Sequence, residues 1–134
     1  MRFFKPTLLA LTCIPFFGQV YAQSDLDRQL ADWDAIPVRQ DLEVYCSRSL
    51  KYAESIIALK NKDQNILPAL RWAEAEAERE APMVPSEPMM AIGTMRILLN
   101  LIQRSYADQP IYSKISGGFP QWVHKSCLKG KSLN

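Results

Sequence analysis

The sequence has few of the residue types that build metal sites and nucleophilic active sites. It contains one histidine, His124, and three cysteines among 134 residues. Only Cys46 and Cys127 lie outside the apolar N-terminal segment, and no cysteines and histidines cluster along the chain. A structural zinc site needs four such ligands, so we expect neither a bound metal nor a cofactor.

Glycine is also scarce, with five residues, and only Gly117 and Gly118 are adjacent. This pair lacks the lysine and the helix entry of a phosphate-binding loop, so it predicts a turn. Acidic residues occur in runs, but these runs are highly polar, and a raised pKa is not expected there. No repeat of 20–50 residues is visible. These absences disfavour an enzyme.

The N-terminal segment has the pattern of an export signal. Two basic residues precede an apolar stretch from Leu8 to Phe17, and tolerated cleavage residues end at Ala22. The pattern predicts a signal peptide over residues 1–22 and a single mature domain over residues 23–134. Lipidation of Cys13 is the alternative, although the residues before it match that signal poorly.

The charge balance of the predicted mature chain gives no reason to expect nucleic acid as a partner. The full chain has 16 basic and 14 acidic residues, and the predicted signal peptide contains two of the basic ones. The mature chain is then neutral overall, so the basic character of the precursor does not indicate nucleic-acid affinity. Arg96 and Arg104 interrupt its most apolar segment, residues 89–106, so we expect no membrane insertion after signal removal.

Residues 41–60 form the clearest amphipathic helix in the sequence. Leu42, Tyr45, Cys46, Leu50, Ala53, Ile56 and Ile57 recur at steps of three and four, which predicts one buried face. Cys46 lies on that face. In an exported chain its expected partner is Cys127, which would close a loop of about 80 residues worth roughly 4–5 kcal/mol in the loop-entropy model.

The remaining segments predict an all-α bundle of four or five helices stapled by this disulfide. Ser24 resembles the N-cap of a first helix, and Pro68 suits the first turn of a third. Pro120 is expected to open the last helix. The expected helices cover residues 24–36, 41–60, about 68–81, 89–106, a short turn at 111–115, and a final segment from 120.

A surface for a protein partner is predicted at the end of the third helix. The acidic run from Glu74 to Glu80 leads into residues 82–88, which carry three prolines. We assign the partner-binding role to Glu74, Glu78, Met83 and Val84, because a rigid, partly apolar loop is a fair recognition element. The alternatives are a solvated helix face and a packed connection. Likewise Met89, Met90 and Met95 are expected in the core, with an adaptable binding surface as the alternative.

Taken together, the layout resembles a group of small exported all-helical bacterial proteins with one disulfide. The features that carry the resemblance are the signal peptide, Cys46 followed by Ala53, Lys60 and Asn61, an apolar helix ending near Tyr106, and Cys127 in the last turn. The group includes periplasmic immunity proteins of type VI secreted amidases. The resemblance implies a stoichiometric protein inhibitor and assigns no functional residues.

The expected function is therefore that of an exported, non-catalytic protein-binding domain, periplasmic or secreted, of the immunity type. A periplasmic acid-stress chaperone is the first alternative, since those proteins are also helical with one disulfide. A small enzyme centred on His124 is the second, because Cys127 follows three residues later on the same helix face. That site would need a free thiolate, which the predicted disulfide removes.

Overall fold

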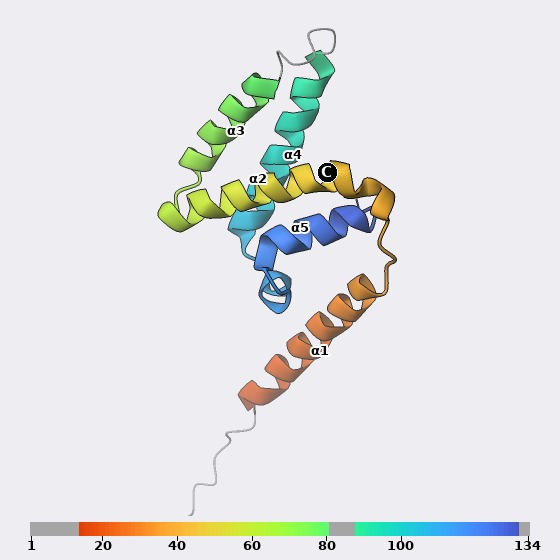
Figure 1. Ribbon diagram of the computed structural model, residues 1–134. Helices are drawn as coiled ribbons and strands as arrows, with labels where there is room; N and C mark the ends of the chain where they lie inside the picture. The colour runs from red at the N-terminus through yellow and green to blue at the C-terminus, as the bar shows by residue number, and fades with distance from the viewer. Residues whose placement is uncertain (1–13, 81–87, 132–134) are drawn as a thin grey trace, which may run out of the picture. The chain divides into compact units, whose positions relative to one another are not determined.

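The structure, a computed structural model, describes the backbone of residues 14–80 and 88–131. Every regular element in these ranges is helical, which confirms the predicted all-α class. The chain divides into two compact units, residues 1–35 and 36–134, which we describe separately. The elements are α1 (Ile14–Asp34), the 3-10 turn η1 (Gln40–Leu42), α2 (Glu43–Lys62), α3 (Leu67–Glu80), α4 (Pro88–Ala107), the 3-10 turn η3 (Pro110–Lys114) and α5 (Gly118–Leu128) (Figure 1).

The first unit contains α1, which is longer than the helix predicted over 24–36. It begins at Ile14 and continues through the predicted cleavage point after Ala22. Ser24 therefore lies inside a helix, and its predicted role as an N-cap is wrong. Within the described ranges, no helix combines the length and apolar character needed to cross a membrane.

The second unit is built around α2. Figure 1 shows α5 running alongside α2, and α3 running alongside α4, and α2 also packs against α4 and α3. The helix bounds lie within two or three residues of the predicted ones for α2, α3, α4 and α5. With 14 and 11 residues, α3 and α5 are shorter than about 15 residues, a length at which helices are marginal alone, so their stability comes mainly from this packing.

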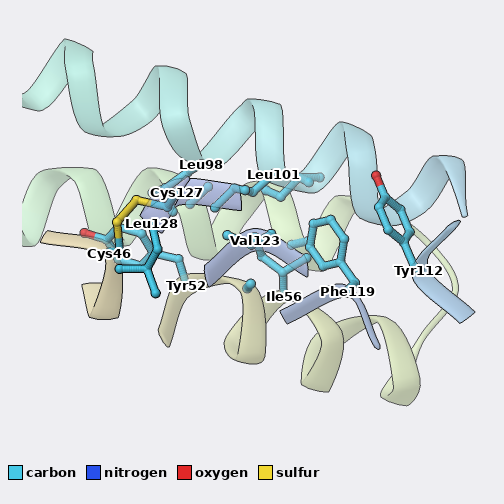
Figure 2. Close-up of a cluster of buried hydrophobic side chains, with 14 residues drawn as sticks. Cys46, Tyr52, Ile56, Leu98, Leu101, Tyr112, Phe119, Val123, Cys127 and Leu128 are labelled. Atoms are coloured by element: carbon cyan, nitrogen blue, oxygen red, sulfur yellow. A yellow bond between two sulfur atoms is a disulfide. The ribbon is translucent and has the colours of Figure 1, made fainter. Parts of the chain in front are cut away.

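One apolar core joins α2, α4 and α5. Ile56 of α2, Leu98 and Leu101 of α4, and Val123 of α5 are each completely buried. Figure 2 shows these side chains together with the disulfide at one end of the cluster. Full burial of one such side chain contributes roughly 1.5–3 kcal/mol, so this cluster supplies a large share of the stability of the unit.

The buried face of α2 is rotated from the predicted one. Cys46, Ala53 and Ile56 are buried as expected, but Tyr45 is 61% exposed and its predicted burial is wrong. Tyr52 is buried in its place, together with Ser49. Helical spacing alone places Tyr45 beside Cys46, and only the positions of α5 and of the α3–α4 pair decide which flank of the stripe they cover.

A disulfide between Cys46 and Cys127 ties α5 to α2, as predicted. The two Cα atoms are 5.6 Å apart, and the cysteines are separated by 81 residues in sequence. Both are buried. The backbone N–H of Arg39 donates a hydrogen bond to the carbonyl of Leu128 at 2.7 Å, so the segment entering α2 is held to the end of α5 as well.

The other end of α2 is fixed to the end of α4 by Lys60. Its ammonium group donates a hydrogen bond to the backbone carbonyl of Ser105 at 2.8 Å and lies 3.7 Å from the carboxylate of Asp108. The same ammonium lies over the ring of Tyr106, 5.6 Å from its centre. A cation is favoured at helix C-termini, where carbonyl groups lack partners, and here one lysine serves two helices.

The turn before α5 depends on glycine and on an aromatic cluster. Gly117 has φ of 86°, and a Cβ atom there would lie 2.3 Å from the side chain of Gln121. The helix then begins at Gly118, two residues before the predicted Pro120. The ring of Tyr112 lies 4.9 Å from that of Phe119 and 5.0 Å from that of Trp122, and burial raises the pKa of Tyr112.

Replacing both disulfide cysteines with alanine should lower the free energy of unfolding by about 2–5 kcal/mol, because the unfolded chain regains the freedom of a long loop. Urea denaturation followed by far-UV circular dichroism measures the change. Reductant should destabilise the native protein by a similar amount and leave the Cys46→Ala/Cys127→Ala variant unchanged. Equal stability of the oxidised protein and the double variant would contradict a stabilising role of the bond.

Candidate functional site

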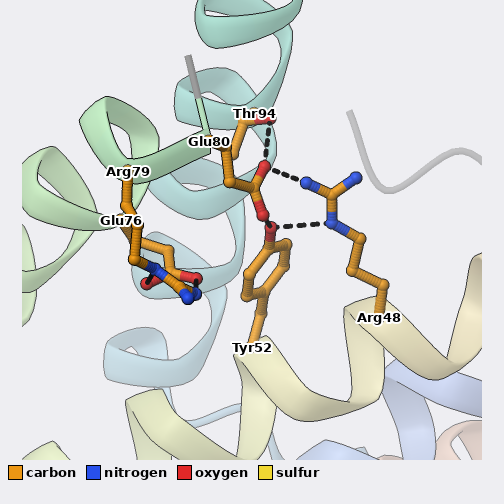
Figure 3. A network of polar contacts seen from close by, with 6 residues as sticks. All are labelled: Arg48, Tyr52, Glu76, Arg79, Glu80 and Thr94. Atoms are coloured by element: carbon orange, nitrogen blue, oxygen red, sulfur yellow. Dashed lines mark hydrogen bonds and ion pairs between the residues drawn. The ribbon is translucent and has the colours of Figure 1, made fainter. Parts of the chain in front are cut away.

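A cluster of polar contacts among the described residues lies where α2, α3 and α4 meet. Glu80, the last residue of α3, has a side chain that is only 17% exposed. Its carboxylate accepts hydrogen bonds from the hydroxyl of Tyr52 on α2 and from Thr94 Oγ1 on α4, the latter at 3.0 Å. It also forms an ion pair with Arg48 of α2 (Figure 3). One carboxylate therefore joins three helices.

The positions of Arg48 and Tyr52 on α2 allow both side chains to reach Glu80. They are four residues apart, so they lie on the same face one turn apart. Arg48 Nε donates a hydrogen bond to the hydroxyl oxygen of Tyr52 at 2.9 Å. The ring of Tyr52 meets Trp72 of α3 edge to face, with ring centres 6.3 Å apart. The tyrosine thus connects the polar junction to an aromatic contact between α2 and α3.

A second ion pair lies one turn earlier on α3. Glu76 is partly buried, and both of its carboxylate oxygens accept from the guanidinium of Arg79, with Nε at 3.2 Å. This hydrogen bond and the charge of Glu76 raise the pKa of Arg79. The pair involves two donors of one guanidinium, the geometry that gives Arg–carboxylate contacts their specificity.

These residues border a cleft between α2 and α3. Arg48, Tyr52, Glu76, Arg79 and Glu80 line it together with Lys51, Ser55 and Trp72, and its volume is about 270 Å³. We call it the α2–α3 cleft. Its walls carry three cationic groups, two carboxylates and two aromatic rings.

The structure divides the acidic run of α3 between two environments. Glu74 and Glu78, predicted to contact a partner, are exposed and lie one turn apart on the outer side of the helix. Glu76 and Glu80 instead lie in the ion pairs of the cleft. The predicted partner residues Met83 and Val84 lie outside the described residues.

His124 lies beside α2 rather than beside a thiol. Its Nε2 atom is 3.0 Å from Glu43 Oε1, and its side chain is 16% exposed. The sulfur of Cys127 is bonded to Cys46, so no thiolate is available in this arrangement. Among the described residues, no group of three or more His, Cys, Asp or Glu side chains is placed to hold a metal ion.

A second hollow lies along the outer face of α4. Its volume is about 480 Å³, and its lining includes Met95 and Leu99 with the polar side chains Arg96, Asn100 and Gln103. Met95 thus contributes to a surface as well as to the edge of the core. Met89 and Met90 belong to α4, but their side chains lie outside the described residues.

Known proteins provide no guide to either site, since no family model, no curated protein and no solved structure matches this chain. Sequence reasoning singled out neither Arg48 nor Tyr52, and it treated Glu80 as one of four equivalent glutamates. The spacing of four residues between Arg48 and Tyr52 was a signal in the sequence that the two side chains share one face of a helix. Their contact with Glu80, 28 residues beyond Tyr52, had no such signal, because it depends on how α3 packs.

Substituting glutamine for Glu80 should lower the free energy of unfolding by about 1–3 kcal/mol, because the charge that Arg48 pairs with is lost inside a partly buried junction. Glu78→Gln is the matched control on the exposed side of the same helix, with an expected change below about 0.5 kcal/mol. Urea denaturation of both variants makes the comparison. Equal effects would show that the junction contributes nothing beyond an exposed charge.

Proposed function

We propose that this chain is an exported, non-catalytic protein-binding domain that acts as an immunity-type inhibitor of a secreted hydrolase. Export is supported by the N-terminal signal pattern, and a buried disulfide is consistent with an oxidising compartment. The inhibitor role follows from the resemblance of the sequence layout to periplasmic immunity proteins. The surface of α2 supports binding of a protein partner.

The observation that carries the proposal is a rigid apolar surface in the first turn of α2. Val44 is 88% exposed and Tyr45 is 61% exposed. Large apolar side chains next to each other on a helix surface are a common feature of protein interfaces, where tyrosine is enriched. Tyrosine also loses little conformational freedom on binding, because it has only two side-chain torsions.

This surface is held in place from both sides. Cys46, the residue after Tyr45, is bonded to Cys127 of α5. Arg48, about one turn after Tyr45, is paired with Glu80 of α3. A preorganised surface binds more tightly because less freedom is lost when the complex forms. The pairing also places the C-terminal end of α3 beside Arg48, within one turn of Tyr45 on α2.

The outer side of α3 adds charge to this surface. Glu74 and Glu78 are exposed, and they form no ion pair with another described residue. Such unpaired carboxylates favour a partner with a basic surface and raise the rate of association more than the affinity itself. We therefore expect the proposed hydrolase to contact Glu74 and Glu78 through a basic surface.

The groups that could support catalysis are engaged in structural contacts. His124 is paired with Glu43, and the sulfur atoms of Cys46 and Cys127 are bonded to each other. Inhibition by binding requires none of these groups to be free. This arrangement favours a stoichiometric inhibitor over an enzyme centred on His124.

The direct test begins with a search of the genes beside this chain's gene for a secreted hydrolase, whose absence would count against the proposal. A hydrolase found there is purified and titrated with the protein. We expect its activity to fall to zero at one equivalent of the native protein. A hydrolase that stays active with excess protein, and forms no complex with it by isothermal titration calorimetry, would refute the proposal.

The binding surface is tested with matched variants in the same titration. Tyr45→Ala should weaken affinity at least about tenfold, as expected for a central interface tyrosine, whereas Leu67→Ala, an exposed apolar control at the start of α3, should not. Glu78→Lys should slow association, and Glu54→Lys, an exposed control on α2, should have little effect. Equal effects of site and control variants would place the interface elsewhere.

A further inference from the structure

We propose that the α2–α3 cleft binds a small monocarboxylate that carries a flat apolar group. The site is distinct from the exposed surface of Val44 and Tyr45, and the proposal does not depend on the inhibitor function. It rests on three properties of the cleft: the hydrogen-bonding capacity left unused by its residues, its charge balance, and its aromatic wall.

Each of the four carboxylate oxygens in the cleft already accepts a contact from a neighbouring side chain. One carboxylate oxygen of Glu80 accepts a hydrogen bond from the hydroxyl of Tyr52. The other accepts a hydrogen bond from Thr94 and pairs with the guanidinium of Arg48. Both carboxylate oxygens of Glu76 accept hydrogen bonds from the guanidinium of Arg79. The hydroxyl of Tyr52 both donates, to Glu80, and accepts, from Arg48. A ligand rich in donors would therefore find few free acceptors here.

The unused capacity consists of donors. Arg48 uses Nε and Nη2, and Arg79 uses the same two atoms, so each guanidinium keeps Nη1 without a partner among the described residues (Figure 3). Lys51 lines the cleft, and its ammonium contacts no carboxylate in the described part of the chain. Free guanidinium and ammonium donors are the groups that recognise carboxylates and phosphates.

The net charge of the residues lining the cleft favours a carboxylate over a phosphate. Arg48, Lys51 and Arg79 contribute three positive charges, and Glu76 and Glu80 contribute two negative charges. One positive charge remains, and it belongs to Lys51, the cation that has no carboxylate partner. A monocarboxylate neutralises this excess, whereas a dianionic phosphate would bring one negative charge too many close to two glutamates.

The aromatic wall and the volume select the rest of the ligand. Tyr52 of α2 and Trp72 of α3 line the cleft and contact each other edge to face, and flat apolar groups pack well against aromatic faces and edges. The volume of about 270 Å³ is just below the range of common ligand pockets, roughly 300–1,000 Å³, so only a small ligand fits. The cleft therefore fits one aromatic ring and a carboxylate, either as a free small molecule or as the C-terminal residue of a peptide.

Calorimetric titration of the full protein with 3-phenylpropionate and with 3-phenylpropionamide tests the chemistry. These probes share one apolar body and differ in charge. We expect saturable 1:1 binding of the carboxylate and at least tenfold weaker binding of the amide. Inorganic phosphate should bind more weakly than the carboxylate. Equal binding of the amide, tighter binding of phosphate, or no binding of the carboxylate at millimolar concentration would each overturn the proposal.

Matched lysine variants locate the site. Lys51→Gln removes the unpaired charge and should weaken carboxylate binding about tenfold, while Lys62→Gln, an exposed lysine at the end of the same helix, should leave it unchanged. Both variants should unfold at the native urea midpoint, since Lys51 has no ion pair to lose with another described residue. Equal affinities of the two variants would place the ligand outside the cleft.

The source of the carboxylate is distinguished by N-acetyl-Ala-Ala-Phe with a free C-terminus and by the same peptide amidated. A peptide acid that binds at least tenfold more tightly than 3-phenylpropionate assigns the site to polypeptide C-termini. Equal affinity of the two acids assigns it to free small carboxylates. Binding of the amidated peptide as tightly as the acid would overturn the assignment of a carboxylate site.

Discussion

The covalent bond between Cys46 and Cys127 is the constraint on which the second unit depends. It joins residues separated by 81 positions and fixes α5 alongside α2. With α5 in place, Val123 completes the core against Ile56 and Leu101. A domain of this size buries a modest core, so a contribution of a few kcal/mol is large relative to a total stability of about 5–15 kcal/mol.

The contacts of Glu80 attach α3 to α2, as the disulfide attaches α5 to α2. The carboxylate holds the end of α3 against α2 and α4 through Arg48, Tyr52 and Thr94. Because the carboxylate oxygens of Glu80 accept contacts in this way, the partly unused charged groups of the neighbouring cleft are mainly the cations Arg48, Lys51 and Arg79. The anion site inferred above is therefore a by-product of how the helices are joined.

Much of the fold could be predicted from the sequence because its causes are local or chemically restrictive. Proline positions and helical spacing located α2 to α5 within a few residues. The two cysteines outside the predicted signal peptide had only each other as partners. Ser24 and Tyr45 were predicted wrongly for different reasons. The cap at Ser24 required a helix start that the longer α1 removes, and the burial of Tyr45 required a neighbour on that flank of α2.

The sequence by itself determined the helical class, the disulfide and the limits of the helices in the second unit, because periodicity, proline and cysteine act within a turn or through one specific bond. Only the tertiary structure decided that Tyr52 is buried and Tyr45 exposed, that Glu76 and Glu80 face Arg79 and Arg48, and that His124 meets Glu43. Apart from the pair within α3, these contacts join residues on different helices, and their partners depend on how the helices pack.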